Sequence, residues 1–347
     1  MAEPLRLGLA FAFAAILAVA ACRIVMMLGV VDRPTEARKS EVHKIAVPTS
    51  GGLGFALATL FVIQWLAGWQ AHRTLEAIEA GGVAGLLVGF YDDRFALPAL
   101  AKMALLFALC VGLILSDVRV DVLQPRPGVV LELSVVGGGI GSALWLFVVI
   151  NAVNFMDGAN GLSMGMAAIA AAGLSVCCAF TGAWDLGLIA AALSGSLAGF
   201  LVWNAPGRLF AGDAGALFAG AMLSAVSLAL VRLRPDWLLV PPTLMLPWLT
   251  DVLLTLVWRA WRRKPLLSAH RDHVYQIAMK AGLKHWQVSL IHAVWALNAA
   301  IFAMVGAIGG GYAPAVAFLV LLAISVWVHI RVRRSGERAG LVGAGIP

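Results

Sequence analysis

Four short polar clusters interrupt an otherwise apolar chain. They read YDDR at 91–94, NAVNFMDGANG at 151–161, FAGDAG at 210–215 and HRDH at 270–273. A polar group placed in hydrocarbon costs several kcal/mol unless another group compensates it. Each cluster is therefore either a solvated loop end or part of a working site.

The first cluster places two carboxylates side by side, at Asp92 and Asp93. Adjacent side chains on a helix point about 100° apart, so the two cannot face one target equally. One is suited to act as a base or nucleophile while the other orients a cation. The alternative is an interfacial helix end that water solvates, with Arg94 as a neighbour.

The second and third clusters contain oxygen donors. Asn151, Asn154 and Asp157 are spaced three apart, which places them along one helical face. Amide and carboxylate oxygens are hard donors suited to Mg²⁺. Asp213 stands at the start of an apolar run, where it is either a metal ligand aimed at a phosphate or a cap of the helix N-terminus.

The fourth cluster combines imidazole and guanidinium groups. His270, Arg271 and His273 are suited to phosphate recognition through charge-assisted hydrogen bonds. Zinc is disfavoured because no Cys or H-E-x-x-H companion is present. Asp251 lies within an apolar segment, so it is a candidate functional acid, with an interhelical hydrogen bond as the alternative.

Oxygen donors for Mg²⁺ together with Arg, His and Lys describe phosphoryl-transfer chemistry. The sequence has no Walker A motif, which disfavours ATP hydrolysis through a P-loop. A multi-spanning transporter is the competing class, because broken helices and intramembrane acids would suit it. The outer loops, however, offer little matching polar chemistry for a path to the other face.

The composition identifies the elements that must position these residues. Hydrophobic residues make up 61% of the chain and charged residues only 12%, which is typical of a polytopic membrane protein. The expected fold class is all-α, because apolar runs of about 20 residues cross a bilayer as helices. Eleven such runs are predicted, near residues 5–28, 51–70, 77–91, 99–116, 139–154, 162–181, 186–203, 213–231, 237–258, 287–309 and 312–330.

Most Lys and Arg residues fall on one side if the spans alternate, which predicts an outside N-terminus and a cytoplasmic C-terminus. The net charge of +7 then belongs to the membrane surface and to anionic substrates rather than to nucleic acid. Each polar cluster follows an odd-numbered span. All four are therefore expected on the cytoplasmic face, as parts of a shared site.

One transmembrane catalytic domain is expected over residues 1–331. Alternating β-formers around a Pro/Gly centre predict a periplasmic hairpin at 118–136. Residues 259–286 form the longest cytoplasmic loop, which is expected to bind substrate and to include a short amphipathic stretch at 273–281. Residues 332–347 are expected to form a flexible basic tail.

The clusters and their order are similar to those of the polyprenyl-phosphate N-acetylhexosamine-1-phosphate transferases, glycosyltransferase family 4. The resemblance covers the chain from about Asp32 to His285. It implies transfer of a HexNAc-1-phosphate from a UDP-sugar to undecaprenyl phosphate, with UMP leaving. It also implies Mg²⁺ as cofactor (or Mn²⁺), a site facing the cytoplasm in a bacterial inner membrane, and a homodimer as one expected assembly.

The resemblance suggests a role for each matching residue. Asp92 and Asp93 match the acidic pair implicated in activating the lipid phosphate, and Lys102 matches a lysine expected to contact the diphosphate. Asn154 and Asp213 match positions expected to hold Mg²⁺. Asn160 matches the position that reads uracil, where many bacterial members carry Asp and eukaryotic relatives carry Asn. His270, Arg271 and His273 match the cytoplasmic loop that is expected to bind the diphosphate. Further candidates are Asn151, Asp157, Asp251 and Lys44.

One departure bears on the sugar. The phospho-MurNAc-pentapeptide translocase of peptidoglycan synthesis typically carries three consecutive histidines where this chain has HRDH at 270–273. The HRDHVYQ sequence is more similar to O-antigen-initiating members, which use UDP-GlcNAc or deoxy-HexNAc sugars such as FucNAc or QuiNAc. These sugars are therefore expected, and the MurNAc-pentapeptide reaction is the alternative.

Overall fold

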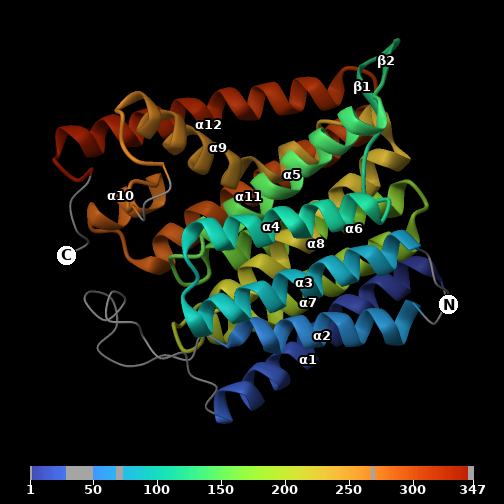
Figure 1. Ribbon diagram of the computed structural model, residues 1–347, viewed down its shortest axis with the longest axis horizontal. Helices are drawn as coiled ribbons and strands as arrows, with labels where there is room; N and C mark the ends of the chain where they lie inside the picture. The colour runs from blue at the N-terminus through green and yellow to red at the C-terminus, as the bar shows by residue number, and fades with distance from the viewer. Residues whose placement is uncertain (1, 29–49, 68–72, 267–269, 343–347) are drawn as a thin grey trace.

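The computed structural model describes residues 2–28, 50–67, 73–266 and 270–342, and this part of the chain is almost entirely helical (Figure 1). The long helices run roughly side by side. In chain order they are α1 (Glu3–Met27), α2 (Gly51–Ala67), α3 (Arg73–Phe95), α4 (Ala99–Leu115), α5 (Val135–Phe155), α6 (Leu162–Phe180), α7 (Trp184–Asn204), α8 (Gly212–Leu233), α9 (Val240–Trp261), α11 (His285–Gly309) and α12 (Ala313–Arg338). A 3₁₀ turn, η1 (Pro235–Trp237), precedes α9, and the short helix α10 (Val274–Lys280) precedes α11.

These helices confirm the prediction of an all-α polytopic membrane protein. Within the described ranges, nine helices are long and apolar enough to cross a membrane, and α2 and α4 are shorter apolar helices. Each of the predicted spans thus corresponds to one long helix. The short helix α10 falls within the stretch predicted to be amphipathic.

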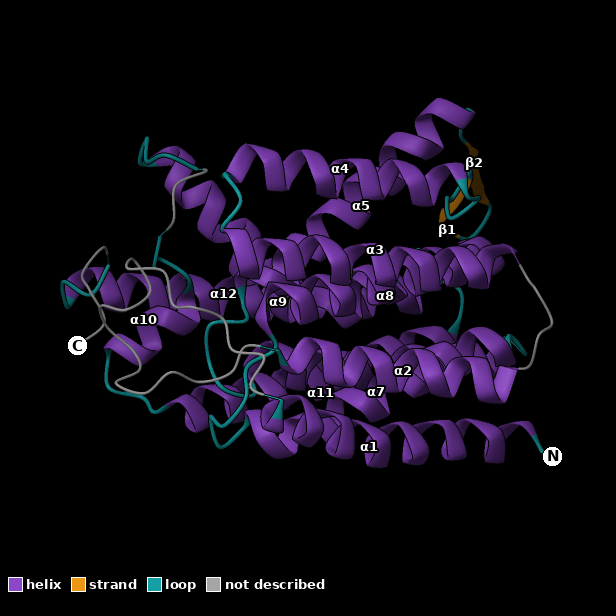
Figure 2. Ribbon diagram, turned by 60° about the horizontal axis from the view of Figure 1, so that its bottom comes forward, coloured by secondary structure: helices purple, strands orange, loops and turns teal. Residues whose placement is uncertain are grey.

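A two-stranded antiparallel hairpin lies within the predicted segment 118–136. Its strands are β1 (Val122–Arg126) and β2 (Val129–Glu132). Pairing is irregular between Leu123 and Arg126, where Pro125 has no N–H to donate to the ladder. Gly128, with φ of 76°, makes the turn. The hairpin lies at the opposite end of the helix bundle from α10 (Figures 1 and 2).

Several helices extend beyond their predicted ends, and two of these extensions change how predicted segments are interpreted. Helix α3 continues to Phe95, so Asp92 and Asp93 belong to its last turn rather than to a loop after it. Helix α12 continues to Arg338, well into the segment expected to be a flexible tail. It remains helical there because buried Arg333 packs against neighbouring elements instead of facing solvent.

The core is organised around α8, whose apolar window is entirely buried. Helix α3 approaches α8 closely through Gly85 and Gly89, a pair of glycines one turn apart on its packing face. A Cβ atom on Gly89 would lie 2.3 Å from the carbonyl oxygen of Asp213. This close approach places the end of α3 directly against the start of α8.

Candidate active site

Four polar side chains from four helices meet at the end of α3. Lys102 Nζ of α4 lies 2.8 Å from Asp92 Oδ2 of α3 and 2.9 Å from Asp213 Oδ2 of α8. It also donates to Asn154 Oδ1 of α5 at 3.3 Å, and Asn154 Nδ2 donates to Asp213 Oδ1 at 2.7 Å. We refer to Asp92, Lys102, Asn154 and Asp213 as the acidic cluster. The structure thus brings together residues that the sequence assigned to one site.

Asp93 points away from its neighbour, as the helical angle between adjacent residues requires. Its carboxylate accepts hydrogen bonds from the backbone N–H of Asp213 at 2.9 Å and of Ala214 at 3.0 Å. These groups belong to the first turn of α8, where four N–H groups have no partner within the helix. Asp93 therefore caps α8 and fixes the position of Asp213, while Asp92 faces Lys102.

The acidic cluster is arranged around a positive charge. The ammonium group of Lys102 contacts oxygens of Asp92, Asp213 and Asn154. Within the described residues, no group of three or more His, Cys, Asp or Glu side chains forms a complete metal cage. Mg²⁺ commonly takes only one or two protein carboxylates and completes its shell with substrate phosphates and water. Asp213 and Asn154 have the donor chemistry for such a partial ligand set.

Asp157 lies just after the C-terminal end of α5, near the carboxylates of Asp213 and Asp93. Burial raises the pKa of its carboxyl well above the usual value, and the charges of Asp213 and Asp93 raise it further. The surroundings of Asp157 therefore favour the protonated form of its carboxyl. A bound cation beside Asp213 would lower this pKa by cancelling the repulsion.

Asp251 of α9 forms interhelical contacts with the start of α10. Its Oδ1 atom accepts a hydrogen bond from the backbone N–H of Val274 at 2.9 Å, and its Oδ2 accepts from Tyr275 N at 3.2 Å. His273 Nδ1 lies 3.3 Å from the same Oδ1 atom. The interhelical hydrogen bonding expected as the alternative for Asp251 is present, and this buried carboxylate caps α10.

The 270–273 segment is held just before α10. His273 is buried, and its ring centroid lies 5.0 Å from that of half-buried His270. Burial is the largest cause that lowers the pKa of His270 to about 4, and the nearby His273 and Arg259 contribute to the same shift. At neutral pH His270 is thus an uncharged imidazole, which is suited to donate a hydrogen bond to a phosphate rather than to pair with it as a cation.

Helix α5 links the 270–273 segment to the acidic cluster. The ring of Phe155, which directly follows Asn154, has its centroid 6.4 Å from that of His273. Tyr275 Oη donates to the Phe155 carbonyl at 3.3 Å. The basic segment and the acidic cluster therefore flank the C-terminal end of one helix.

Three further predicted residues are not members of the acidic cluster: Asn160, Asn151 and Lys44. Asn160 has its backbone N–H directed at His285 Nδ1 at 3.3 Å, and its side-chain Oδ1 is buried with no hydrogen-bond partner among the described residues. Asn151 Nδ2 donates to Phe147 O of its own helix at 2.7 Å, so Asn151 does not join the acidic cluster. Lys44 lies outside the described residues.

A buried ionic group that was not predicted from the sequence includes one residue of the 270–273 segment. Asp272, between the two histidines, pairs with Arg259 of α9, and both side chains are almost fully buried. Arg333 of α12 donates to the Asp272 carbonyl at 2.9 Å. The available signal was the presence of ionisable residues within or beside apolar spans, which the sequence analysis used only for Asp251.

Comparisons with known proteins agree with this arrangement. Residues 76–231 match the model of glycosyl transferase family 4. The chain is 25% identical to a probable undecaprenyl-phosphate N-acetylglucosaminyl 1-phosphate transferase of Bacillus subtilis, over 76% of this chain and 73% of that protein. It is 29% identical to the decaprenyl-phosphate N-acetylglucosaminephosphotransferase of Mycobacterium leprae, over 78% and 76% of the two chains.

A third relative carries out a different named reaction. The phospho-N-acetylmuramoyl-pentapeptide-transferase of Lactiplantibacillus plantarum is 31% identical, over 56% of this chain and 65% of that protein. The matched family segment contains Asp92, Lys102, Asn154 and Asp213, the four residues of the acidic cluster. The chain is therefore a multi-pass membrane protein in which residues 76–231 are similar to glycosyl transferase family 4.

Proposed function

We propose that this chain transfers an N-acetylhexosamine-1-phosphate from a UDP-sugar to undecaprenyl phosphate, releasing UMP. GlcNAc or a deoxy-HexNAc such as FucNAc or QuiNAc is the proposed sugar, and the product would start O-antigen or another surface polysaccharide. The observation that carries the proposal is the acidic cluster beside a histidine- and arginine-containing segment, in a chain whose residues 76–231 match family 4. The basic loops support a site at the cytoplasmic face of the bacterial inner membrane.

In the proposed reaction, an oxygen of the lipid phosphate attacks the phosphorus that bears the sugar. The bond from that phosphorus to the bridging oxygen breaks, and UMP leaves with the electron pair. Lys102, between Asp92 and Asp213, supplies positive charge where two phosphate groups must approach each other. His270 and Arg271, in the segment that contacts the end of α5 through His273, bind the diphosphate.

Asp213 and Asn154 are the proposed holders of Mg²⁺, with Mn²⁺ as a substitute. When bound, the ion would neutralise the diphosphate and stabilise the leaving UMP. Asp93 contributes indirectly, because its cap on the first turn of α8 sets the direction of the Asp213 carboxylate. Asp92, which is hydrogen-bonded to Leu97 N at 2.7 Å, is held in place to orient Lys102 and the acceptor phosphate.

The similarity to a phospho-N-acetylmuramoyl-pentapeptide-transferase keeps the MurNAc-pentapeptide reaction as the second candidate. The test is UMP release by the purified full-length protein with undecaprenyl phosphate, Mg²⁺ and a panel of UDP-sugars. The panel includes UDP-GlcNAc, UDP-FucNAc, UDP-QuiNAc and UDP-MurNAc-pentapeptide. Turnover with an N-acetylhexosamine donor supports the proposal, and turnover with the pentapeptide donor alone would replace it with the second candidate.

Two variants complete this experiment. Asp213→Ala removes an acidic-cluster carboxylate and should abolish release, whereas Glu132→Gln removes an exposed carboxylate on the hairpin and should not. Thermal denaturation would first establish that the purified protein is folded. If the folded protein released no UMP with any donor, the proposed function would be overturned.

A further inference from the structure

The backbone of the 270–273 segment is held by side chains from several helices. Lys280 of α10 donates from Nζ to the Arg271 carbonyl at 2.9 Å. Arg333 of α12 donates from Nη2 to the Asp272 carbonyl, also at 2.9 Å. Asp251 of α9 accepts from the backbone just after His273. Consecutive residues are thus tied to different helices.

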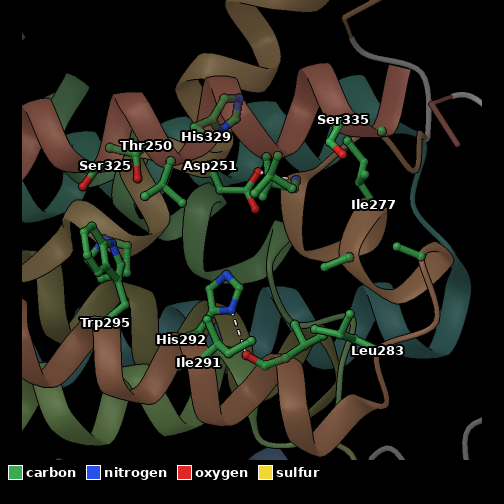
Figure 3. Close-up of a pocket in the computed structure, with 18 of the residues that line it drawn as sticks. Thr250, Asp251, Ile277, Leu283, Ile291, His292, Trp295, Ser325, His329 and Ser335 are labelled. Carbon is green, nitrogen blue, oxygen red and sulfur yellow. Dashed lines mark hydrogen bonds between the residues drawn. The ribbon is translucent and has the colours of Figure 1, made fainter. Parts of the chain in front are cut away.

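Apolar packing alone does not hold α10 and the segment before it in place, because a cavity lies beside this helix. A cavity of about 850 Å³ is bounded by α9, α10, α11 and α12, and Val274, Ile277 and Ala278 of α10 line it. Asp251 and His329 lie on the wall of this cavity (Figure 3). A short helix that borders an open space gains less from apolar contact on that side. The polar contacts therefore contribute to its position together with the buried side chains of Tyr275, Ile277 and Met279.

Arg333 is the contact that comes from farthest along the chain. Its side chain is only 4% exposed. Nη2 donates to Thr255 Oγ1 at 2.6 Å as well as to the Asp272 carbonyl, and Nε donates to His329 Nε2 at 3.1 Å. The guanidinium carbon also lies 4.6 Å from the ring centroid of Trp258. Arg333 therefore connects α12, α9 and the 270–273 segment.

A buried guanidinium at this place has a cost that an apolar side chain would avoid. Removing a charge from water costs several kcal/mol, and ionisable residues within membrane spans are functional candidates by default. Most of the apolar window of α12 faces outward, since only 28% of that window is buried. A Leu or Met at position 333 would suffice to pack α12 against Trp258. What the guanidinium adds is a directed hydrogen bond to Asp272.

We propose that Arg333 is a positioning residue for the transfer reaction, which holds the 270–273 segment in the geometry that binds the diphosphate of the sugar donor. The inference rests on the proposed function, because it assigns His270 and Arg271 to that diphosphate. It extends the working site to α12, which lies outside the segment that matches the family model. Arg333 touches no substrate in this scheme and acts through the backbone of Asp272.

The first test compares Arg333→Gln and Arg333→Lys with Arg334→Gln. Arg334 is the next residue on α12 and is exposed, so its variant is matched in charge and position. Loss of one hydrogen bond to a charged group predicts a fall in kcat/KM of about tenfold to a hundredfold for Arg333→Gln. The change should appear mainly in KM for the UDP-sugar, with a smaller effect on KM for undecaprenyl phosphate. Lys restores part of the loss because it keeps the charge but not the fork of donors.

The second test separates positioning from general destabilisation. If Arg333 acts through the 270–273 segment, then Arg333→Gln should lower kcat/KM much less in a His270→Ala background than in the wild type. The reason is that the effects of substitutions in residues that act as a unit do not add. Arg333→Lys in the same background, which keeps the charge but not the fork of donors, provides the same test if Arg333→Gln does not fold. Unchanged KM with lower thermal stability, or fully additive losses, would overturn the inference. An inactive wild type would instead refute the proposed function.

Discussion

Replacing Lys102 with Met tests whether the acidic cluster is built around a positive charge. Lys102 Nζ lies 2.8 Å from Asp92 Oδ2 and 2.9 Å from Asp213 Oδ2, and the three side chains are only 13%, 10% and 18% exposed. At an effective dielectric constant of about 20, each contact represents roughly 6 kcal/mol of gross attraction. Removing one partner of a buried pair costs about 3–5 kcal/mol net, because the remaining charges stay uncompensated. The variant should lose about that much unfolding free energy in the absence of metal.

The assay is denaturation in detergent with and without Mg²⁺. If the cation binds among the same oxygens, Mg²⁺ should restore stability to the Lys102→Met protein more strongly than it stabilises the wild type. UMP release should fall by about 100-fold or more, because the diphosphate loses a preorganised charge. Arg94→Met, which removes an exposed basic residue from the same end of α3, is the matched control. An equal response of both proteins to Mg²⁺, or a variant as stable as the wild type, would refute this reasoning.

Three further predictions concern the surroundings of the cluster. Asp93→Asn removes one of two charge-assisted contacts to the first turn of α8, so the unfolding free energy of the variant should fall by about 1.5–3 kcal/mol. An inactive variant with wild-type stability would instead show that Asp93 acts on substrate. Gly89→Val should lower the unfolding free energy by about 1–3 kcal/mol and reduce turnover, because its Cβ would lie 2.3 Å from Asp213 O. Gly112→Ala serves as the control, because a Cβ atom at Gly112 meets nothing within 4 Å. The pKa of His270 is lowered from 6.5 to about 4, so the unfolded chain takes up the proton first as pH falls. Stability should therefore decline from pH 6.5 towards pH 4, and His270→Gln should lack this part of the decline in denaturation curves at pH 7 and 5.

Much of the fold follows from local properties of the chain. In a bilayer the backbone has no water with which to form hydrogen bonds, so each long apolar run must become a helix. Composition and run length were therefore enough to predict every long helix of the described residues, and alternating β-formers around a Pro/Gly centre predicted the hairpin. Helix ends were less predictable, because polar residues such as Asp92 and Arg333 continue a helix when tertiary partners satisfy them.

The sequence identified which residues carry chemistry, and the tertiary structure decided what each one does. Residue types and spacing alone selected Asp92, Asp93 and Asp213, since carboxylates are rarely tolerated beside apolar spans without a partner. Only the packing of α3 against α8 showed that Asp93 caps a helix that begins about 120 positions later, whereas Asp92 turns to Lys102. Side-chain roles depend on directions and close approaches between distant segments, such as the contact that Gly89 permits, and no local pattern encodes them.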